Sequence, residues 1–317
     1  MSIILVNDYL HGINDERTLW DFMLEGIPNI VRVDIPVLDS NPILKKMNIP
    51  FEKKVEYYIN HFHPDHKLII QNGTFFPLIL SSKPKVAFIQ DNLRKMQRPT
   101  HLQEYNFKNA DYIVTNSNEV DKYYHERSTH QIPLGIDTKL FSILDKNELR
   151  NKYDIDTEKY KHVGIFVGAL NEVKGWNRVK NITQEHKDVF WIIVTKYSEG
   201  VELENGRVFS RISQETLSEL YNCADFFILG SPSETQCLAA IECCLCDVPI
   251  IMMNTGFLTN LSSEEKDKIG IIGDDLEGAV YNMKNNYTNY KPREVLYDYY
   301  SIDDMCKKWI ELIETIC

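Results

Sequence analysis

The sequence of 317 residues has no long apolar run and no cysteine before position 223. No stretch approaches the roughly 18 apolar residues that span a bilayer, and residues 1–8 become polar too soon for a signal peptide. We therefore expect a cytoplasmic protein without a transmembrane segment, which leaves room for peripheral contact with a membrane. The seven cysteines, five of them between Cys223 and Cys246, form no disulfide framework. We expect reduced thiols packed as small apolar side chains.

An excess of positive charge is also missing, because the formal net charge is -11. Binding the phosphate backbone of a nucleic acid requires a basic face on the protein, which releases counterions from that backbone. The composition therefore argues against a nucleic-acid partner. A small anionic ligand needs only a cation or two together with backbone amides, so such a ligand is still allowed.

Short apolar runs alternate with longer amphipathic stretches along the chain. The runs are rich in Ile and Val and do not alternate cleanly with polar residues, which is typical of strands covered on both faces. This pattern predicts an α/β protein with doubly wound parallel sheets. The expected strands are 3–7, 30–35, 67–71, 86–90 and 112–116, followed by 163–167, 190–195, 207–209, 225–229 and 249–252.

The length favours two domains, each with its own core. Regularity breaks near Pro133 and Gly135, and residues 145–153 predict one charged helix that links the domains. We expect a Rossmann-like domain over 1–145 and a second over 146–298. Residues 299–317 would form a helix that crosses back to the first domain. Two such domains in tandem would leave a cleft where their strand ends face each other.

Residues 168–175 follow a predicted strand and precede a predicted helix. Gly168 lets backbone amides approach a diphosphate, and Lys174 can supply positive charge. An ordinary surface turn with a solvated lysine is an equally good interpretation of this segment alone.

Residues 231–242 carry a stronger pattern. Pro232 and Ser233 suit a turn that opens into a helix, whose first amides can bind an anion. Glu234 and Glu242 lie two helical turns apart and can accept hydrogen bonds from sugar and ribose hydroxyls. Alternatively, Glu234 only interacts favourably with the helix dipole, and Glu242 lies on a solvated face. Against this alternative, Glu242 lies in so apolar a stretch that its carboxylate needs a partner.

These residues resemble the retaining glycosyltransferases of the GT-B type grouped as family four. The resemblance runs in order over most of the chain: residues 110–117 (strand ending in serine), 132–137 with Phe141 (linker signature), 168–175 (donor-phosphate loop), Glu234 and Glu242 (two glutamates seven residues apart), and 246–249 (end of that helix). It implies a GT-B architecture, two Rossmann-like domains with a cleft between them.

The resemblance also implies roles for matching residues. Lys174 would bind the donor diphosphate, Glu234 the transferred sugar and Glu242 the ribose hydroxyls. Gln90 stands where many relatives have a histidine near the reacting sugar, so Lys174, Glu234 and Gln90 are the candidate catalytic residues. The remaining donor-binding candidates are Gly168, Ala169, Ile212 (beside the nucleobase), Thr235, Gln236, Cys237 and Leu238, and Gly12 would line the acceptor side.

The sequence departs from the family at several of these positions. Ala169 stands where the family usually has an arginine. One charge-assisted contact worth roughly 1.5–3 kcal/mol would therefore be missing, unless Arg178, Lys196 or Arg211 makes that contact instead. Thr235 and Cys237 take the place of glycines. Leu134 replaces the linker asparagine, and Asp247 stands where a glycine is common.

From this resemblance we expect a hexosyl- or pentosyltransferase that uses a nucleotide-diphosphate sugar and retains anomeric configuration. The acceptor would be a glycan or a lipid- or protein-linked sugar. No cofactor or metal is expected. An inactive nucleotide- or sugar-binding relative is the alternative that the departures favour. A Rossmann oxidoreductase is weakened because residues 8–14 lack the glycine fingerprint.

Two acidic or histidine-rich patterns suggest a metal at first sight. Asp154 and Asp156 have the spacing of a metal-binding pair, but they lie in a charged linker and not at a strand end. The histidines of segment 61–66 surround a proline, and a chance polar loop explains them better than a metal site does.

Overall fold

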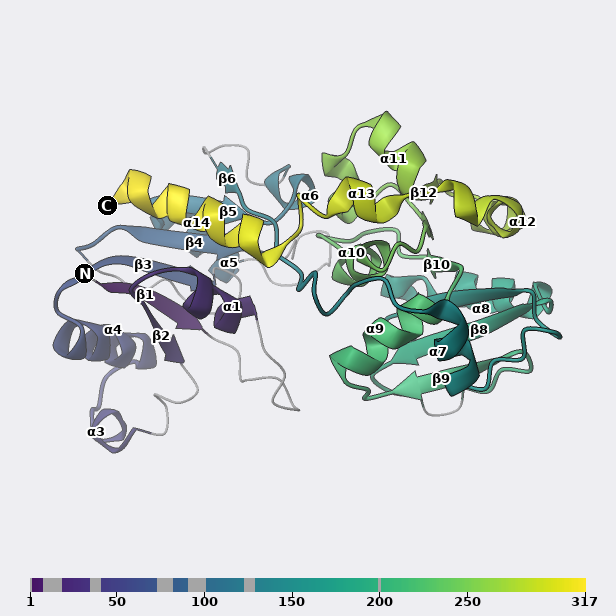
Figure 1. Ribbon diagram of the computed structural model, residues 1–317. Helices are drawn as coiled ribbons and strands as arrows, with labels where there is room; N and C mark the ends of the chain where they lie inside the picture. The colour runs from purple at the N-terminus through teal and green to yellow at the C-terminus, as the bar shows by residue number, and fades with distance from the viewer. Residues whose placement is uncertain are drawn as a thin grey trace. The chain divides into compact units, whose positions relative to one another are not determined.

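The computed structural model describes residues 2–7, 19–34, 41–72, 82–90, 101–122, 129–198 and 201–317. The chain divides into two compact units, one made of Met1–Gly135 with Ile302–Cys317 and the other of Ile136–Ser301. Each unit has its own sheet with helices around it (Figure 1). The predicted α/β fold with two doubly wound parallel sheets is confirmed.

The first unit contains a parallel sheet in the order β2-β1-β3-β4-β5-β6. Its strands are β1 (Ser2–Asn7), β2 (Ile30–Asp34), β3 (His66–Asn72), β4 (Lys85–Ile89), β5 (Tyr112–Thr115) and β6 (Thr129–Gln131). Because successive side chains point to opposite faces, Ile3 and Leu5 join one apolar cluster while Ile4 and Val6 join another. The sheet is therefore buried on both faces.

Helices from both ends of the chain complete this first core. They are α1 (Leu19–Gly26), α3 (Pro42–Lys45), α4 (Phe51–Phe62), α5 (His101–Asn109), α6 (Asn118–Asp121) and α14 (Ile302–Ile316). The C-terminal α14 packs against α1, and its Trp309 meets Phe88 of β4 edge-to-face with ring centroids 5.3 Å apart. Gly26 is needed at this crossing, since a Cβ there would lie 2.4 Å from the sulfur of Cys306.

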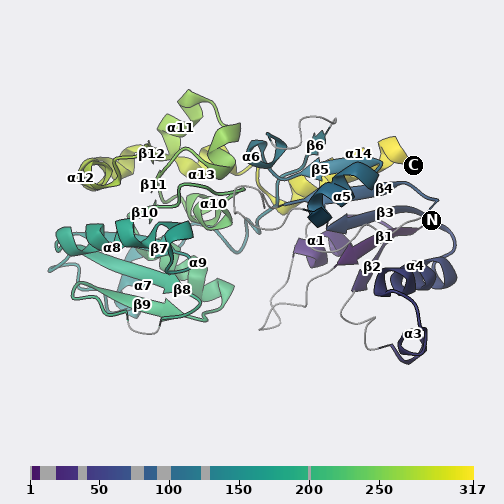
Figure 2. The ribbon, with the colours of Figure 1, turned by 180° about the vertical axis from the view of Figure 1, so that it is seen from behind.

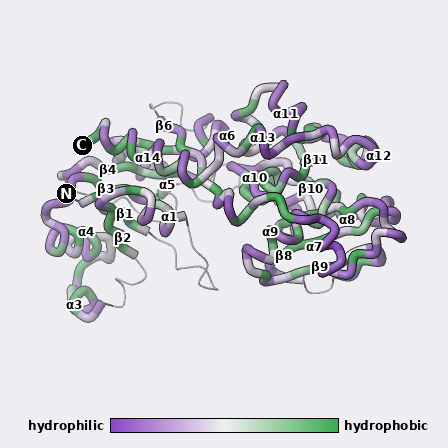
Figure 3. Tube along the Cα trace, viewed as in Figure 1, coloured by the Kyte–Doolittle hydropathy of each residue, from purple (hydrophilic) through white to green (hydrophobic). Residues whose placement is uncertain are grey.

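The second unit contains a parallel sheet in the order β12-β11-β10-β7-β8-β9. Its strands are β7 (His162–Val167), β8 (Val189–Thr195), β9 (Gly206–Ser210), β10 (Phe226–Leu229), β11 (Ile250–Met252) and β12 (Gly270–Ile272). Every residue of β8 is buried, as its continuous apolar run predicts for a strand covered on both faces (Figure 3).

The helices of the second unit lie on both faces of this sheet. They are α7 (Lys146–Lys152), α8 (Trp176–Glu185), α9 (Gln214–Cys223), α10 (Leu238–Leu245), α11 (Ser263–Ile269), α12 (Leu276–Asn286) and α13 (Pro292–Leu296). Figures 1 and 2 view the sheet from opposite sides and show α8 on one face and α7 with α9 on the other. Connections between parallel strands are right-handed, so a helix changes face when the strand order changes direction. The chain runs outward from β7 through β8 to β9 and then returns to β10, which places α8 and α9 on opposite faces.

The strand order of the second unit reverses between β7 and β10. The chain leaves β7 towards one edge of the sheet and leaves β10 towards the other edge. In open α/β sheets, ligands bind at such a topological switch point. The loops that follow β7 and β10 are residues 168–175 and 230–237, which include both segments that the sequence singled out.

All ten predicted strands are present within one or two residues in the described part of the chain. Two strands were not predicted, β6 and β12, and each has only three residues. Helix α6 covers Asn118–Asp121, and residues 123–128 lie outside the described part of the chain.

The division between the units falls at 135/136, ten residues before the predicted boundary at 145/146. Residues 137–144 belong to the second unit because its side chains hold them. The amide of Leu144 donates to Asn222 at 2.8 Å, and Arg293 donates to the carbonyl of Phe141 at 3.0 Å. The C-terminal segment of the first unit begins at Ile302, where the sequence suggested 299.

Candidate active site

Two glycines bring the loops after β7 and β10 into direct contact. Gly175 has φ +66°, and a Cβ there would lie 2.0 Å from the carbonyl oxygen of Gly230. A Cβ on Gly230 would in turn lie 2.6 Å from the carbonyl oxygen of Gly175. Only residues without side chains allow the two backbones to approach this closely. The sequence analysis missed Gly230, although a glycine directly after a strand is a signal for close backbone approach.

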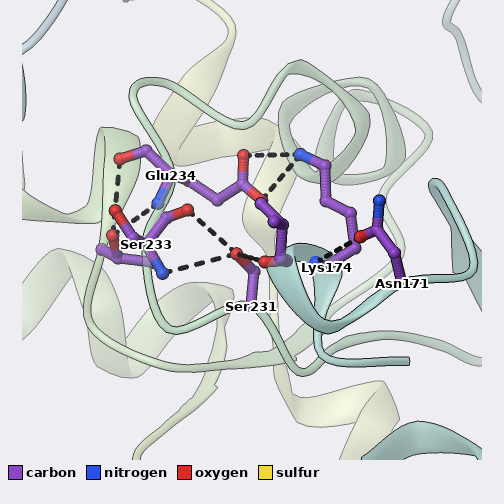
Figure 4. Close-up of polar contacts among 7 residues, drawn as sticks. Asn171, Lys174, Ser231, Ser233 and Glu234 are labelled. Atoms are coloured by element: carbon purple, nitrogen blue, oxygen red, sulfur yellow. Dashed lines mark hydrogen bonds and ion pairs between the residues drawn. The ribbon is translucent and has the colours of Figure 1, made fainter. Parts of the chain in front are cut away.

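Lys174 and Glu234 meet across this contact (Figure 4). The Lys174 Nζ donates to both carboxylate oxygens of Glu234, each at 2.8 Å. The Glu234 side chain is 7% exposed and that of Lys174 is 33% exposed. Asn171 holds the turn before the lysine, since its side chain accepts from the Lys174 amide at 3.1 Å. The two residues predicted to face one ligand therefore lie side by side, within one unit.

The loop that carries Glu234 is fixed by hydroxyl groups on either side of it. Ser231 donates to the carbonyls of Val173 and Ser233, at 2.8 and 2.9 Å, and so joins the two loops (Figure 4). The amide of Glu234 donates to Thr255 Oγ1 at 2.9 Å. Thr255 lies 21 residues further along the chain, and the sequence analysis did not single it out.

The helix that was expected to open at residues 232–234 begins later, so that prediction was wrong. Helix α10 starts at Leu238, with Cys237 as its N-cap residue. Glu234 lies in the preceding loop, and helical spacing does not relate it to Glu242. The contact with Thr255 and the backbone of Cys237 hold the loop in a non-helical path.

Cys237 adopts a left-handed backbone, with φ +69° and ψ +66°. A residue with a Cβ pays roughly 1–2 kcal/mol for this conformation, which glycine adopts freely. Cys237 is also buried, at 8% exposure. Burial, followed by the charge of Glu234, raises the pKa of its thiol, while Lys174 acts in the opposite direction. The sequence departs at this position from the family that it resembles, and the charges of Glu234 and Lys174 both act on the thiol.

Glu242 projects from α10 towards Tyr221 of α9. The Tyr221 hydroxyl donates to Glu242 Oε2 at 3.0 Å, and Tyr221 itself is fully buried. Burial raises the pKa of Glu242 to about 7, although the hydrogen bond from Tyr221 lowers it. The carboxylate therefore has the partner that its apolar surroundings require. The sequence analysis missed Tyr221, because a contact between two helices leaves no local pattern.

The three cations that could compensate for the arginine absent at position 169 each contact another side chain in the structure. Ala169 itself is exposed. Arg178 donates to the sulfur of Met253 at 3.3 Å. Lys196 and Arg211 both lie against the ring of Tyr197, at 5.6 and 5.8 Å from its centroid.

The other predicted donor-side residues are spread over the same strand ends. Gly168, at the end of β7, packs against the Lys174 side chain, since a Cβ there would lie 3.5 Å from Lys174 Cγ. Ile212 follows β9 and is half-buried, and Thr235 is half-buried beside Glu234. The Gln236 carbonyl accepts from the Phe257 amide at 3.0 Å. Leu238 opens α10 and is 38% exposed.

The two candidates from the first half of the chain belong to the first unit. Gln90 directly follows β4 and is half-buried, and its carbonyl accepts from the Asn116 side chain at 3.1 Å. Gly12 lies outside the described residues.

The described residues contain no group of three or more His, Cys, Asp or Glu side chains that could hold a metal ion. In segment 61–66, His66 Nδ1 lies 2.8 Å from the carbonyl oxygen of His63. The five cysteines between Cys223 and Cys246 are free and buried. No helix in the described part of the chain is both long and apolar enough to cross a membrane.

Comparison with known proteins relates the chain to sugar-transferring enzymes. Residues 145–299 match the family model for glycosyl transferases group 1. The chain resembles sucrose-phosphate synthase from Thermosynechococcus elongatus with a TM-score of 0.75 and 14% identity, over 99% of this chain and 98% of the other. No curated protein matches it.

Two structures of Anabaena Alr3699/HepE are also similar over 99% of this chain and 100% of theirs. The complex with UDP gives a TM-score of 0.77 at 14% identity. The complex with UDP-glucose gives 0.74 at 13% identity. At these identities the similarity shows that the fold is shared.

Proposed function

We propose that the protein transfers a sugar from a nucleoside-diphosphate sugar to a hydroxyl acceptor, because residues 145–299, nearly all of the second unit, match the family model for glycosyl transferases group 1. The observation that carries the proposal is the meeting of Lys174 and Glu234 at the topological switch point. The ammonium group suits a diphosphate, and the carboxylate suits the hydroxyls of a sugar.

The proposed donor site extends from this pair along the strand ends of the second unit. Lys174, with the backbone around Gly168 and Ala169, would bind the diphosphate. Glu242 would accept hydrogen bonds from the ribose hydroxyls, and Ile212 would lie beside the nucleobase. Backbone amides of residues 235–238 would face the phosphate or the sugar. Gln90 and Gly12 of the first unit remain candidates for the reacting sugar and the acceptor side.

We propose that transfer retains the anomeric configuration. The bond from the anomeric carbon to the diphosphate oxygen breaks, and the acceptor oxygen bonds to that carbon on the same face. The departing phosphate oxygen takes the acceptor proton, so no side-chain base is required. Lys174 stabilises the negative charge that grows on the diphosphate. The transferred group is proposed to be a hexosyl or pentosyl unit, and the acceptor a glycan or a sugar linked to lipid or protein.

A panel of nucleotide sugars tests this proposal, starting with UDP-glucose because the structure of Anabaena HepE includes that compound. We expect transfer or slow hydrolysis of one donor, unchanged by a metal chelator. Lys174→Ala should weaken binding of the nucleoside diphosphate by at least about tenfold, since a charge-assisted contact is lost. Lys187→Ala, which alters a lysine that is 70% exposed, is the matched control and should bind like the wild type. Equal affinity in both variants would overturn the site.

A second candidate function is that of an inactive sugar- or nucleotide-binding relative. The exposed Ala169, in place of a cation, and the strained Cys237 beside the charged pair favour it. The panel of nucleotide sugars also distinguishes these two candidate functions. Nucleotide binding with neither transfer nor hydrolysis on any donor supports the binding protein, whereas turnover of a donor supports the enzyme.

A further inference from the structure

One carboxylate oxygen of Glu242 is held by a hydrogen bond within the protein. Tyr221 donates to Oε2 at 3.0 Å. Glu242 is half-buried, so part of its side chain is accessible to a ligand. A bidentate acceptor that already uses one oxygen presents the other in a fixed direction.

The tyrosine is itself held rigidly. Tyr221 lies in α9 with no exposed surface, and its ring meets that of Phe141 edge-to-face at 6.0 Å. A buried tyrosine hydroxyl needs a hydrogen-bond partner, and Glu242 provides it. The orientation of the carboxylate is therefore set by a neighbouring helix and not by α10 alone.

We propose that Tyr221 is a positioning residue for the proposed donor site, which orients the Glu242 carboxylate through its hydrogen bond to Oε2 and directs the other carboxylate oxygen towards the hydroxyls of the ligand. This inference rests on the proposed function, because it assigns Glu242 to the ribose. Tyr221 would act only through Glu242 and would not touch the ligand.

The ionisable groups around Glu242 allow the role of Tyr221 to be measured as a change in the pKa of Glu242. The ionisable groups described as interacting with Glu242 are Tyr221 from α9 and the thiols of Cys237, Cys243 and Cys246 from α10 and its ends. None of these groups is a cation. Burial raises the pKa of Glu242 to about 7, and the Tyr221 hydroxyl is the group that lowers it. Removing that hydroxyl should therefore move the titration of Glu242 to higher pH.

The first experiment needs no ligand. Infrared difference spectra follow the carbonyl band of the protonated Glu242 side chain against pH, with Glu242→Gln as the reference that lacks it. We expect a midpoint near 7 in the wild type, and in Tyr221→Phe a midpoint about one pH unit higher, because a hydrogen bond to a charged group is lost. Tyr153→Phe is the matched control, since it removes a hydroxyl that donates to Glu219 of the same α9. An unchanged midpoint in Tyr221→Phe overturns the proposal.

The second experiment measures the affinity for UDP, or for whichever nucleoside diphosphate binds, by calorimetry at several pH values. The ratio of Kd between Tyr221→Phe and wild type should rise as pH falls and level off near tenfold, as a shift of about one pH unit requires. A tyrosine that only stabilises the fold would give a ratio independent of pH, and that result also overturns the proposal. If no nucleoside diphosphate binds the wild type, the proposed function fails, while the infrared titration still decides whether Tyr221 controls Glu242.

Discussion

The carboxyl group of Glu242 makes the stability of the second unit depend on pH. Burial raises the pKa of Glu242 from 4.5 to about 7, against the hydrogen bond from Tyr221. Between these values the folded protein binds more protons than the unfolded chain does, so stability falls as pH rises. The cost is absent below about pH 4.5 and complete above about pH 7.

Replacing Glu242 by glutamine should remove that cost. Glutamine keeps an oxygen for the Tyr221 hydroxyl but cannot ionise. We expect Glu242→Gln to have a higher free energy of unfolding than the wild type at pH 8, by on the order of 2 kcal/mol, and an equal one near pH 4. Urea denaturation at both pH values measures the difference.

Glu219 provides the control with the opposite sign. Against the effect of its partial burial, hydrogen bonds from Lys152 and Tyr153 lower its pKa. Its ionised form therefore adds stability above its unfolded pKa, which is lost as pH falls. Glu219→Gln should be less stable than the wild type at pH 8. Stability differences that do not change with pH in either variant would contradict the assigned ionisation states.

The ion pair of Lys174 and Glu234 should oppose binding of a diphosphate. Glu234 holds the ammonium group that the diphosphate requires, and its own charge repels the ligand. We expect Glu234→Gln to bind the nucleoside diphosphate roughly tenfold more tightly, about 1.4 kcal/mol, while sugar transfer falls. Calorimetry and a transfer assay give the two values. Glu204→Gln, at a residue whose side chain is 83% exposed, should change neither. Weaker binding by Glu234→Gln would exclude this competition.

At the scale of elements, the proposed donor site depends on one close contact between two loops. Gly175→Ala adds a Cβ 2.0 Å from the Gly230 carbonyl oxygen at a backbone with φ +66°. We expect a loss of about 2 kcal/mol or more in the free energy of unfolding, and weaker nucleotide binding because the loops must separate. Gly273→Ala, at a glycine with no atom within 4 Å of its added Cβ, should leave both unchanged. A Gly175→Ala variant that binds and unfolds like the wild type would show that the loops do not need this contact.

The strands were predictable from the sequence because burial on both faces produces continuous apolar runs, as in β8. The start of α10 was not, because Pro232 and Glu234 have the local chemistry of a helix start. The actual start at Leu238 depends on Thr255, which binds the loop from 21 residues away. A local pattern contains no information about such a contact.

In the candidate site, too, contacts between residues far apart in the sequence could not be predicted from local patterns. The family resemblance predicted that Lys174 and Glu234 face one ligand, and the structure places them 2.8 Å apart. Which atoms surround them was not predictable. Tyr221 pairs with a carboxylate 21 residues away on another helix, and Gly230 matters only because Gly175 lies against it. These contacts arise from the packing of α9 on α10 and from the strand order.

At the scale of the whole molecule, each of the two units buries its own apolar residues, and the cluster on one face of the first sheet is completed by the end of the chain. Met305, Trp309 and Leu312 of α14 join the cluster that contains Leu5 and residues of other strands of the first sheet. The apolar cluster of the second unit lies within residues 136–300. A defect in one core should therefore act first on its own unit.

Trp309→Ala tests this separation. Trp309 is fully buried against Phe88, so its truncation should cost about 3–5 kcal/mol. Hydrogen exchange read by mass spectrometry should become faster in β1, β3 and β4 and stay unchanged in β7 and β10, with nucleotide affinity preserved. Trp191→Ala, which removes a fully buried indole from β8, should give the reverse pattern and abolish nucleotide binding. Equal acceleration in both sheets for either variant would contradict this separation and would mean that the two cores unfold as one cooperative body.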